Sequence, residues 1–256
     1  VVVYDEAHGT LGWNIDLLAG LARQIESGEI DIYQNVANVM GGSGNDTMRG
    51  SAGNDTLRGG AGYDIVYASL GSDVLAGEEI RYTEVNAGSI KLNLATGRVE
   101  KTGGVDQISG FVNVYGTDFA DTLTGSSVAN VLLGGGGKDE IYGGGGDDFL
   151  AGQGGNDTIF GGTEGDRIFG DEGEDFLYGE DGLDTLDGGD NNDVLYGGNN
   201  SDTLLGGTGN DWLDAGNDLA SDSIDGGTGF DTIIGSRGND TIDGGLDGAH
   251  LDYSGL

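Results

Sequence analysis

The sequence contains no cysteine and no proline, and it is poor in basic side chains. Without cysteine, the chain has neither disulfides nor thiolate metal ligands. Glycine is abundant, with 56 residues. A collagen triple helix is nevertheless excluded, because it needs glycine at every third position together with proline. No run of about 20 apolar residues occurs, so the sequence predicts no membrane span.

The charge of the chain is strongly negative. Its 45 Asp and Glu residues against 10 Lys and Arg give a net charge of −35 at pH 7. This charge destabilises a compact state through self-repulsion, and it disfavours nucleic acid and anionic lipid as partners. Carboxylates are instead the ligands of hard cations such as Ca2+. Disorder is the usual consequence of such a composition, but 36% hydrophobic residues permit a fold if they are regularly placed.

A nine-residue repeat supplies that regular placement in residues 41–76 and 116–252. Typical blocks read GGSGNDTMR, GGGGDDFLA and GGTGNDWLD. In all nineteen blocks the eighth residue is aliphatic or Met; the sixth residue is Asp in seventeen of them, and the first residue is Gly in seventeen. One block, 215–225, carries two extra residues. A disordered linker would have no reason to keep an apolar residue at every ninth position.

Each block predicts a tight turn followed by a short strand. Glycine permits the positive φ values of such a turn and lets backbone carbonyl oxygens approach a ligand. The eighth side chain points inward, and the seventh and ninth point outward. Two blocks make a coil of 18 residues. Because one coil cannot bury its apolar row, the coils must stack, and the sequence predicts an all-β solenoid.

These blocks resemble the RTX family, whose hemolysin-type calcium-binding repeats follow the pattern GGxGxDxUx. The resemblance implies a right-handed parallel β-roll with Ca2+ between turns 18 residues apart, held by position-six carboxylates and turn carbonyl oxygens. On one edge it implies the ligands Asp121, Asp139, Asp157, Asp175, Asp193, Asp211 and Asp231. On the other edge it implies Asp148, Asp166, Asp184, Asp202, Asp222 and Asp240, and in the shorter repeat run Asp46 with Asp64 and Asp55 with Asp73.

Some blocks depart from the pattern. Asn130 keeps a side-chain oxygen without the charge, so we expect a weak site there. Ala249 offers no side-chain ligand, so we expect the roll to end at that block. Blocks 188–205 carry Asn in place of the fourth Gly. Asn tolerates left-handed backbone geometry, so we expect these turns to survive.

Residues 1–40 and 81–115 lack the nonapeptide but resemble each other. GEIDIYQNVANVMGGSGNDTM aligns without gaps to GGVDQISGFVNVYGTDFADTL, and WNIDLLAG matches IKLNLATG. Both segments show period-two alternation, which predicts short strands with one buried face. The expected order is therefore an irregular β module (1–40), a short roll (41–80), a second irregular module (81–115), a long roll (116–252) and the start of a further module (253–256).

The sequence shows no catalytic signature. His8 and His250 are its only histidines, and it has no HExxH motif, no nucleophile motif and no EF-hand loop. Acidic pairs like those of a glycosidase are expected by chance in so acidic a chain. The NDT triplets fit the glycosylation pattern but follow from the GNDT turns. We expect a non-catalytic region whose parent protein can be an enzyme or a toxin.

Aromatic residues recur on one face of the long roll. Position nine supplies Tyr142, Phe160, Tyr178 and Tyr196, and position seven adds Phe176 and Trp212. They predict an exposed aromatic face, and exposed apolar patches often mark interaction sites. The alternative is that this face packs against the irregular module or a neighbouring domain.

Calcium is expected to act as a folding switch. Without it, carboxylates stacked along two edges repel each other, and the thin core cannot offset the chain entropy. With on the order of ten ions bound, binding free energy becomes folding free energy. Extracellular modules bind calcium at about 10⁻⁴–10⁻³ M, so we expect folding outside the cell. The RTX resemblance implies a secreted or cell-surface bacterial protein exported by a type I system.

Three functions remain open. The first is a calcium-dependent module that stabilises a larger secreted protein and contacts its neighbouring domains. The second is polysaccharide or surface binding through the aromatic face, as in an adhesin or in the R-modules of mannuronan epimerases. The third is membership of an enzyme or toxin whose active domain lies elsewhere. Ice binding is disfavoured, because the sequence has no regular outward Thr ladder.

Overall fold

The computed structural model describes residues 2–3, 12–24, 30–32, 36–83 and 88–252, and every structural statement below refers to these. Within them the regular elements are strands, and no helix is long and apolar enough to cross a membrane. The chain forms two compact units, Val1–Asp118 (unit 1) and Phe119–Leu256 (unit 2). The predicted segments 1–40, 41–80 and 81–115 all fall in unit 1, and 253–256 lies outside the described residues.

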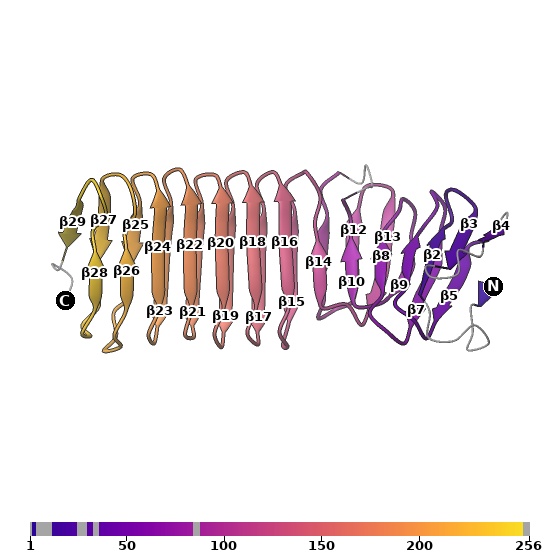
Figure 1. Ribbon diagram of the computed structural model, residues 1–256, viewed down its shortest axis with the longest axis horizontal. Coiled ribbons are helices and arrows are strands. Elements are labelled where there is room, and N and C mark those ends of the chain that lie inside the picture. The colour runs from indigo at the N-terminus through magenta and orange to yellow at the C-terminus, as the bar shows by residue number, and fades with distance from the viewer. Residues whose placement is uncertain (1, 4–11, 25–29, 33–35, 84–87, 253–256) are drawn as a thin grey trace. The chain divides into compact units, whose positions relative to one another are not determined.

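Unit 2 is a parallel β-solenoid made of two sheets (Figure 1). One sheet contains β15 (Thr122–Ser126), β17 (Glu140–Gly145), β19 (Thr158–Thr163), β21 (Phe176–Asp181), β23 (Val194–Asn199), β25 (Trp212–Asp214), β27 (Asp231–Ile234) and β29 (Ala249–Asp252). The other contains β16 (Val131–Gly136), β18 (Phe149–Gly154), β20 (Arg167–Glu172), β22 (Thr185–Asp190), β24 (Thr203–Thr208), β26 (Ser223–Asp225) and β28 (Thr241–Asp243).

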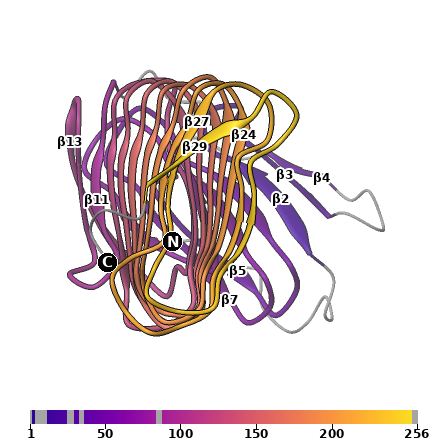
Figure 2. The same ribbon diagram turned by 90° about the vertical axis from the view of Figure 1, so that its left-hand side faces the viewer.

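The register of unit 2 confirms the predicted coil of two nonapeptides. Each strand pairs in parallel with the next strand but one, so that Ile141 lies opposite Ile159, 18 residues later. The two extra residues of block 215–225 lengthen one coil, and Thr203 consequently pairs with Ser223. Viewed end-on in Figure 2, the coils of unit 2 lie one behind another, so equivalent turns form two continuous edges.

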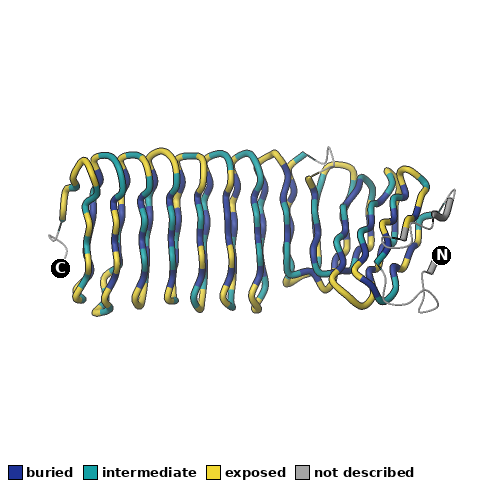
Figure 3. The backbone as a smooth tube through the Cα atoms, viewed as in Figure 1, coloured by how far each residue is buried: buried dark blue, intermediate teal, exposed yellow. Residues whose placement is uncertain are grey.

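The core of unit 2 is the row of position-eight side chains, as predicted. Leu123, Ile141 and Leu177 are fully buried, while many of the exposed residues lie in the turns (Figure 3). Burying each such side chain stabilises the fold by about 1.5–3 kcal/mol. The row fails at the last two blocks, where Ile242 is half-buried and Leu251 is 45% exposed. In the described part of the chain, the outermost coil packs against a neighbour on one side only.

Position-five side chains add a second link between coils. The Asn156 side-chain oxygen accepts the backbone N–H of Glu174 at 3.2 Å, and Asn192 accepts that of Asn210 at 2.7 Å. Asn210 in turn accepts the N–H of Phe230 at 2.8 Å. The Asn of a GNDT turn therefore has a structural role, because it satisfies a turn amide of the next coil.

Unit 1 contains the short roll. One sheet has β1 (Val2–Val3), β5 (Asn38–Gly42), β7 (Thr56–Gly60) and β9 (Val74–Ala76) in parallel. The other has β6 (Thr47–Arg49), β8 (Ile65–Tyr67), β10 (Glu79–Arg81) and β14 (Asn113–Tyr115), also in parallel. Met48, Leu57 and Val66 are fully buried between them, as the position-eight rule predicts.

Two antiparallel excursions interrupt the coils of unit 1. They are β2 (Trp13–Asp16), β3 (Leu21–Gln24) and β4 (Ile30–Ile32), and β11 (Lys91–Asn93), β12 (Arg98–Lys101) and β13 (Gly104–Ser109). Their first turns match, because Asp16 accepts the N–H of Ala19 at 2.9 Å and Asn93 accepts that of Thr96 at 2.8 Å. The two segments related by sequence therefore share a three-stranded antiparallel topology.

Candidate metal centre

The position-six aspartates are buried although they lie in turns. Asp139, Asp157 and Asp175 are at most 1% exposed. Each lies one residue before its strand, so the strand pairing fixes its backbone. Burial of a carboxylate is unfavourable unless partners compensate for the lost hydration. The partners of each oxygen therefore show what the turn requires.

One carboxylate oxygen of each aspartate links successive coils. The backbone N–H of Asp139 donates to Oδ1 of Asp157 at 2.7 Å, and that of Asp157 donates to Oδ1 of Asp175 at 2.7 Å. The same contact continues along this edge to Asp231. On the opposite edge it runs from Asn130 to Asp240. The predicted ligands are thus brought together in two rows.

The second oxygen is different. In thirteen of the predicted aspartates, Oδ2 is buried and has no hydrogen-bond partner within the described residues. These are Asp46, Asp64, Asp139, Asp148, Asp157, Asp166, Asp175, Asp184, Asp193, Asp202, Asp211, Asp222 and Asp231. An unpaired buried carboxylate oxygen costs free energy. A row of them indicates that a cation belongs beside these oxygens.

Position-one glycines form the space in front of these oxygens. A Cβ atom on Gly134 would lie 2.2 Å from Oδ2 of Asp139 and 2.8 Å from the carbonyl oxygen of Gly152. The arrangement repeats at Gly152, whose Cβ would meet Oδ2 of Asp157 at 2.2 Å. Each cradle is therefore lined by a carboxylate oxygen and by a carbonyl oxygen of the next coil. Any side chain at position one would fill it.

These oxygens fit calcium. Ca2+ takes six to eight oxygen ligands from carboxylates and backbone carbonyls in flexible geometry. Among the described residues no three His, Cys, Asp or Glu side chains gather as a metal-binding group. The carboxylates enter the turns singly, so carbonyl oxygens would have to supply most of the ligands. Zinc, which prefers His and Cys, does not fit such a site.

At positions two and four of the nonapeptide block, the backbone of the turn adopts positive φ angles. Gln153 and Glu180 at position two adopt φ values of 77° and 74°, a region that costs a non-glycine residue about 1–2 kcal/mol. Asn191 and Asn200 at position four have φ values of 82° and 77°. The prediction that Asn preserves these turns is confirmed. Glu164 behaves likewise with φ 72°, and its side chain accepts the N–H of Gly146 at 2.9 Å.

The electrostatics of the rows favour a cation. Burial raises the pKa of Asp139 to about 7; a backbone N–H from Asp121 opposes the shift, and the Asp157 carboxylate adds to it. Burial likewise raises the pKa of Asp193 to about 8 and that of Asp148 to about 6. A bound cation would favour the ionised form of these carboxyls, so protons and calcium compete for them.

Four blocks have a different turn, which the sequence-based interpretation missed. The Ser51 hydroxyl and N–H donate to Oδ2 of Asp55 at 3.0 and 2.6 Å, and the Ser69 hydroxyl donates to Oδ2 of Asp73 at 3.0 Å. Ser236 contacts Asp240 in the same way, and Ser126 contacts Asn130. The sequence signal for this kind of turn was serine at position two of the block. Asp55, Asp73 and Asp240 thus lie where predicted, but their second oxygen is satisfied.

The aromatic residues of unit 2 form a stack. Tyr142, Phe160, Tyr178 and Tyr196 lie on adjacent strands, with ring centroids 5.0, 4.7 and 5.0 Å apart and planes within 9° of parallel. These rings are half-buried, and the faces of the inner rings cover each other. Phe176 and Trp212, on the same sheet, are 43% and 40% exposed. The use of this face by a partner stays a prediction.

Comparisons with known proteins identify a matching family and a similar solved structure. The family model described as RTX calcium-binding nonapeptide repeat (4 copies) matches residues 40–75, 115–150, 151–186, 160–195, 178–213, 196–219 and 217–248. Among solved structures, the chain is similar to a hyperactive, Ca2+-dependent, beta-helical antifreeze protein from an Antarctic bacterium. The identity is 19%, 90% of this chain and 80% of that chain are covered, and the TM-score is 0.40. No curated protein sequence matches.

The family match and the buried carboxylate rows lead to the same assignment. The matched segments span more than half of the chain and include the predicted aspartates of both repeat runs. The turns that the match covers contain the glycine cradles and the buried carboxylate oxygens of both units. The chain belongs to the family of RTX calcium-binding nonapeptide repeat proteins.

Proposed function

We propose that this chain is the calcium-dependent folding and stabilising region of a larger secreted protein. The observation that carries the proposal is the row of buried, unpartnered Oδ2 atoms in glycine cradles. Calcium at these positions would supply the missing partner of each oxygen and would tie a carboxylate to a carbonyl of the neighbouring coil. Binding free energy then contributes directly to the stability of the roll.

Charge explains why this folding would depend on calcium. Unit 2 contains 29 of the 45 acidic residues and three of the ten basic ones. Its core is a narrow row of single aliphatic side chains, which offsets little of the chain entropy. Repulsion along the two edges therefore disfavours the folded roll until a divalent cation neutralises them.

Calcium concentration would set the place of folding. Modules of the extracellular kind bind at about 10⁻⁴–10⁻³ M, so the chain would stay unfolded in calcium-poor cytosol and fold outside the cell. The family match supports secretion by a bacterium, since such repeats are typical of secreted proteins. We propose export by a type I system. The region itself would be non-catalytic, with any enzymatic or toxic activity in neighbouring domains of the parent protein.

A calcium titration of the chelated chain, followed by far-UV circular dichroism, tests this function. We expect a steep gain of β signal with calcium and little gain with magnesium at the same concentration. Magnesium is the matched control, because it demands near-ideal octahedral geometry and gives up its waters reluctantly. A chain that keeps its full β signal in excess chelator would contradict the proposal.

Recognition of a polysaccharide or a cell surface is a second candidate. The exposed Phe176 and Trp212 beside the aromatic stack favour it. Tryptophan fluorescence tests it, because the other tryptophan, Trp13, is 3% exposed and supplies a constant background. Addition of alginate oligosaccharide should perturb the emission of Trp212. An unchanged emission, together with unchanged binding after alanine substitution of Phe176, Tyr178 and Trp212, would reject this function.

A further inference from the structure

Along one edge of unit 1, side chains of the protein itself contact the buried aspartate oxygens. This edge carries Asp55, Asp73 and Asp106. We propose that the ammonium group of Lys101 and the hydroxyls of Ser51 and Ser69 take the place of Ca2+ along it, so that this edge folds without calcium. The inference rests on the proposed calcium-dependent folding of the other turns.

The excursion β11–β12–β13 builds this edge. It places Asp106 next after Asp73, and the N–H of Asp73 donates to Oδ1 of Asp106 at 2.9 Å. This is the contact that joins successive aspartates elsewhere in the rows, although here the two residues are 33 positions apart. Asp106 therefore extends the row, and the nonapeptide pattern does not reveal it.

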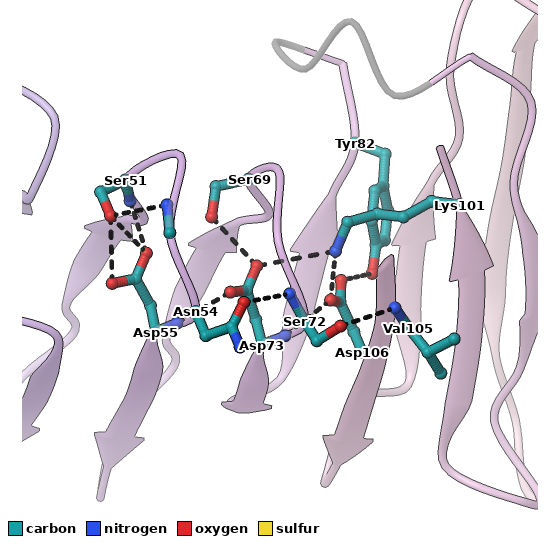
Figure 4. Close-up of polar contacts among 11 residues, drawn as sticks. Ser51, Asn54, Asp55, Ser69, Ser72, Asp73, Tyr82, Lys101, Val105 and Asp106 are labelled. Carbon is teal, nitrogen blue, oxygen red and sulfur yellow. Dashed lines mark hydrogen bonds and ion pairs between the residues drawn. The ribbon is translucent and has the colours of Figure 1, made fainter. Parts of the chain in front are cut away.

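Lys101 lies at the end of this row (Figure 4). It comes from the end of β12, and its side chain is fully buried. Its Nζ forms an ion pair with Oδ1 of Asp106 and lies 3.6 Å from Oδ2 of Asp73. A buried ammonium between two buried carboxylates is a cation in the environment that calcium requires, but it is covalently part of the chain.

Every carboxylate oxygen of this cluster has a partner. Oδ2 of Asp106 accepts the hydroxyl of the buried Tyr82 at 2.9 Å. Oδ1 of Asp73 accepts the N–H of Asp55 at 2.9 Å, and its Oδ2 accepts the Ser69 hydroxyl. Asp46 and Asp64 lie on the opposite edge of the same unit. Their Oδ2 atoms have no hydrogen-bond partner among the described residues.

The backbone distinguishes the two kinds of turn independently. In calcium-type turns position two has positive φ, for example 119° at Gly60 and 77° at Gln153. Ser51 is not among the positive-φ residues, and its N–H turns toward Oδ2 of Asp55 at 2.6 Å. Serine at position two thus closes the turn onto its own aspartate with both its backbone and its side chain.

The same closure occurs at two turns of unit 2. The N–H groups of Ser126 and Ser236 donate to Asn130 and Asp240, each at 2.8 Å. Neither serine has a positive φ. We extend the inference to both turns, so on this edge of unit 2 the calcium-type turns with a glycine cradle are those from Asp148 to Asp202.

Hydrogen–deuterium exchange of the full chain, in chelator and in calcium, tests the inference. Amides of residues 98–109 should be protected in chelator and change little with calcium, whereas those of 134–214 should gain protection only with calcium. Lys101→Gln should abolish the protection of 98–109 in chelator, and calcium should restore it. Lys91→Gln, which removes an exposed ammonium from the adjacent strand, is the matched control and should behave like the parent chain.

A second variant tests the inference even if Lys101→Gln fails to fold. Ser236→Gly restores the glycine of position two, and native mass spectrometry should count one more bound calcium ion than in the parent chain. An unchanged count, or calcium-dependent protection of 98–109 in the parent chain, overturns the inference. Absence of calcium-dependent protection throughout 134–214 would overturn the proposed function instead, so the two failures are distinguishable.

Discussion

The two units use one repeat but compensate its charges differently. Unit 1 has seven of the ten basic residues, and unit 2 has three. On the outer face of unit 1, Arg81 lies over the rings of Tyr67 and Tyr115, with centroid distances of 5.7 and 4.4 Å. On unit 2, the sheet that contains β17, β19, β21 and β23 carries a stack of four aromatic rings on its outer face.

The turns show the same contrast. One edge of unit 1 satisfies its aspartates with Ser51, Ser69 and Lys101, whereas most turns of unit 2 leave one carboxylate oxygen unpartnered among the described residues. A nonapeptide roll can therefore be held by donors within the chain or by ions from solution. The choice depends on position two of each block and on whether a basic side chain reaches the row.

Filling a glycine cradle should have the largest effect. Gly170→Val would place its Cβ 2.4 Å from Oδ2 of Asp175 and 2.5 Å from the carbonyl oxygen of Gly188. We expect loss of calcium ions from the neighbouring turns and a markedly lower melting temperature in calcium, measured by native mass spectrometry and calorimetry. Gly53→Ala in unit 1 is the control, because its nearest contact would be 3.7 Å away. Equal melting temperatures for both variants would show that the cradle is not needed.

Neutralising one aspartate in each unit should separate the two kinds of turn. Asp175→Asn keeps an oxygen that can accept the N–H of Asp157 but removes the charge that a calcium ion requires. We expect the calcium midpoint of folding to rise for Asp175→Asn and to change little for Asp55→Asn, whose oxygens already accept from Ser51. Circular dichroism titrations measure both midpoints. Equal shifts would show that Asp55 also binds an ion.

Much of this comparison was predictable, because the nonapeptide is local. The phase of Gly, Asp and Leu fixes the turn, the strand and the inward side chain, and the register of Ile141 against Ile159 follows from stacking. Lys101 and Asp106 were not predictable, since an antiparallel excursion outside the repeat brings them to the row. Serine at position two was visible in the sequence, but its effect depends on the φ angle of the turn.

The pH dependence should be opposite with and without calcium. The pKa of Asp139 and of Asp175 is raised by burial to about 7 in the folded chain, above the ordinary value of 3.8. Without calcium, their contribution to stability is complete below about pH 4 and is lost as the pH rises through about 7. In chelator, any β signal that remains at pH 5 should therefore fall as the pH rises to 8, as followed by circular dichroism.

Calcium should reverse this trend, because binding displaces the protons from these carboxyls. In excess calcium, stability should rise over the same pH range. The closed edge of unit 1 serves as the internal reference, and exchange of its amides should not follow this reversal. A β signal in chelator that increases from pH 5 to 8 would contradict the raised pKa values.

Breaking one outer ladder in each unit should have the smallest effect. Tyr178→Ala removes two ring contacts, each worth about 0.5–1.5 kcal/mol. Tyr67→Ala removes contacts with Arg49 and Arg81, each worth about 0.5–1 kcal/mol at an exposed site. Thermal melts in calcium at low and high potassium chloride compare them. The loss at Tyr67 should shrink with salt, and an equally salt-sensitive loss at Tyr178 would contradict the stacking account.

The most direct test of the central claim is calcium titration of the chelated chain with hydrogen–deuterium exchange resolved along the sequence. We predict that residues 134–214 gain protection together, in a cooperative transition with calcium and not with magnesium. Residues 98–109 should already be protected before calcium is added. Full protection of 134–214 in excess chelator would contradict the account, because the roll would then fold without a cation beside its buried carboxylates.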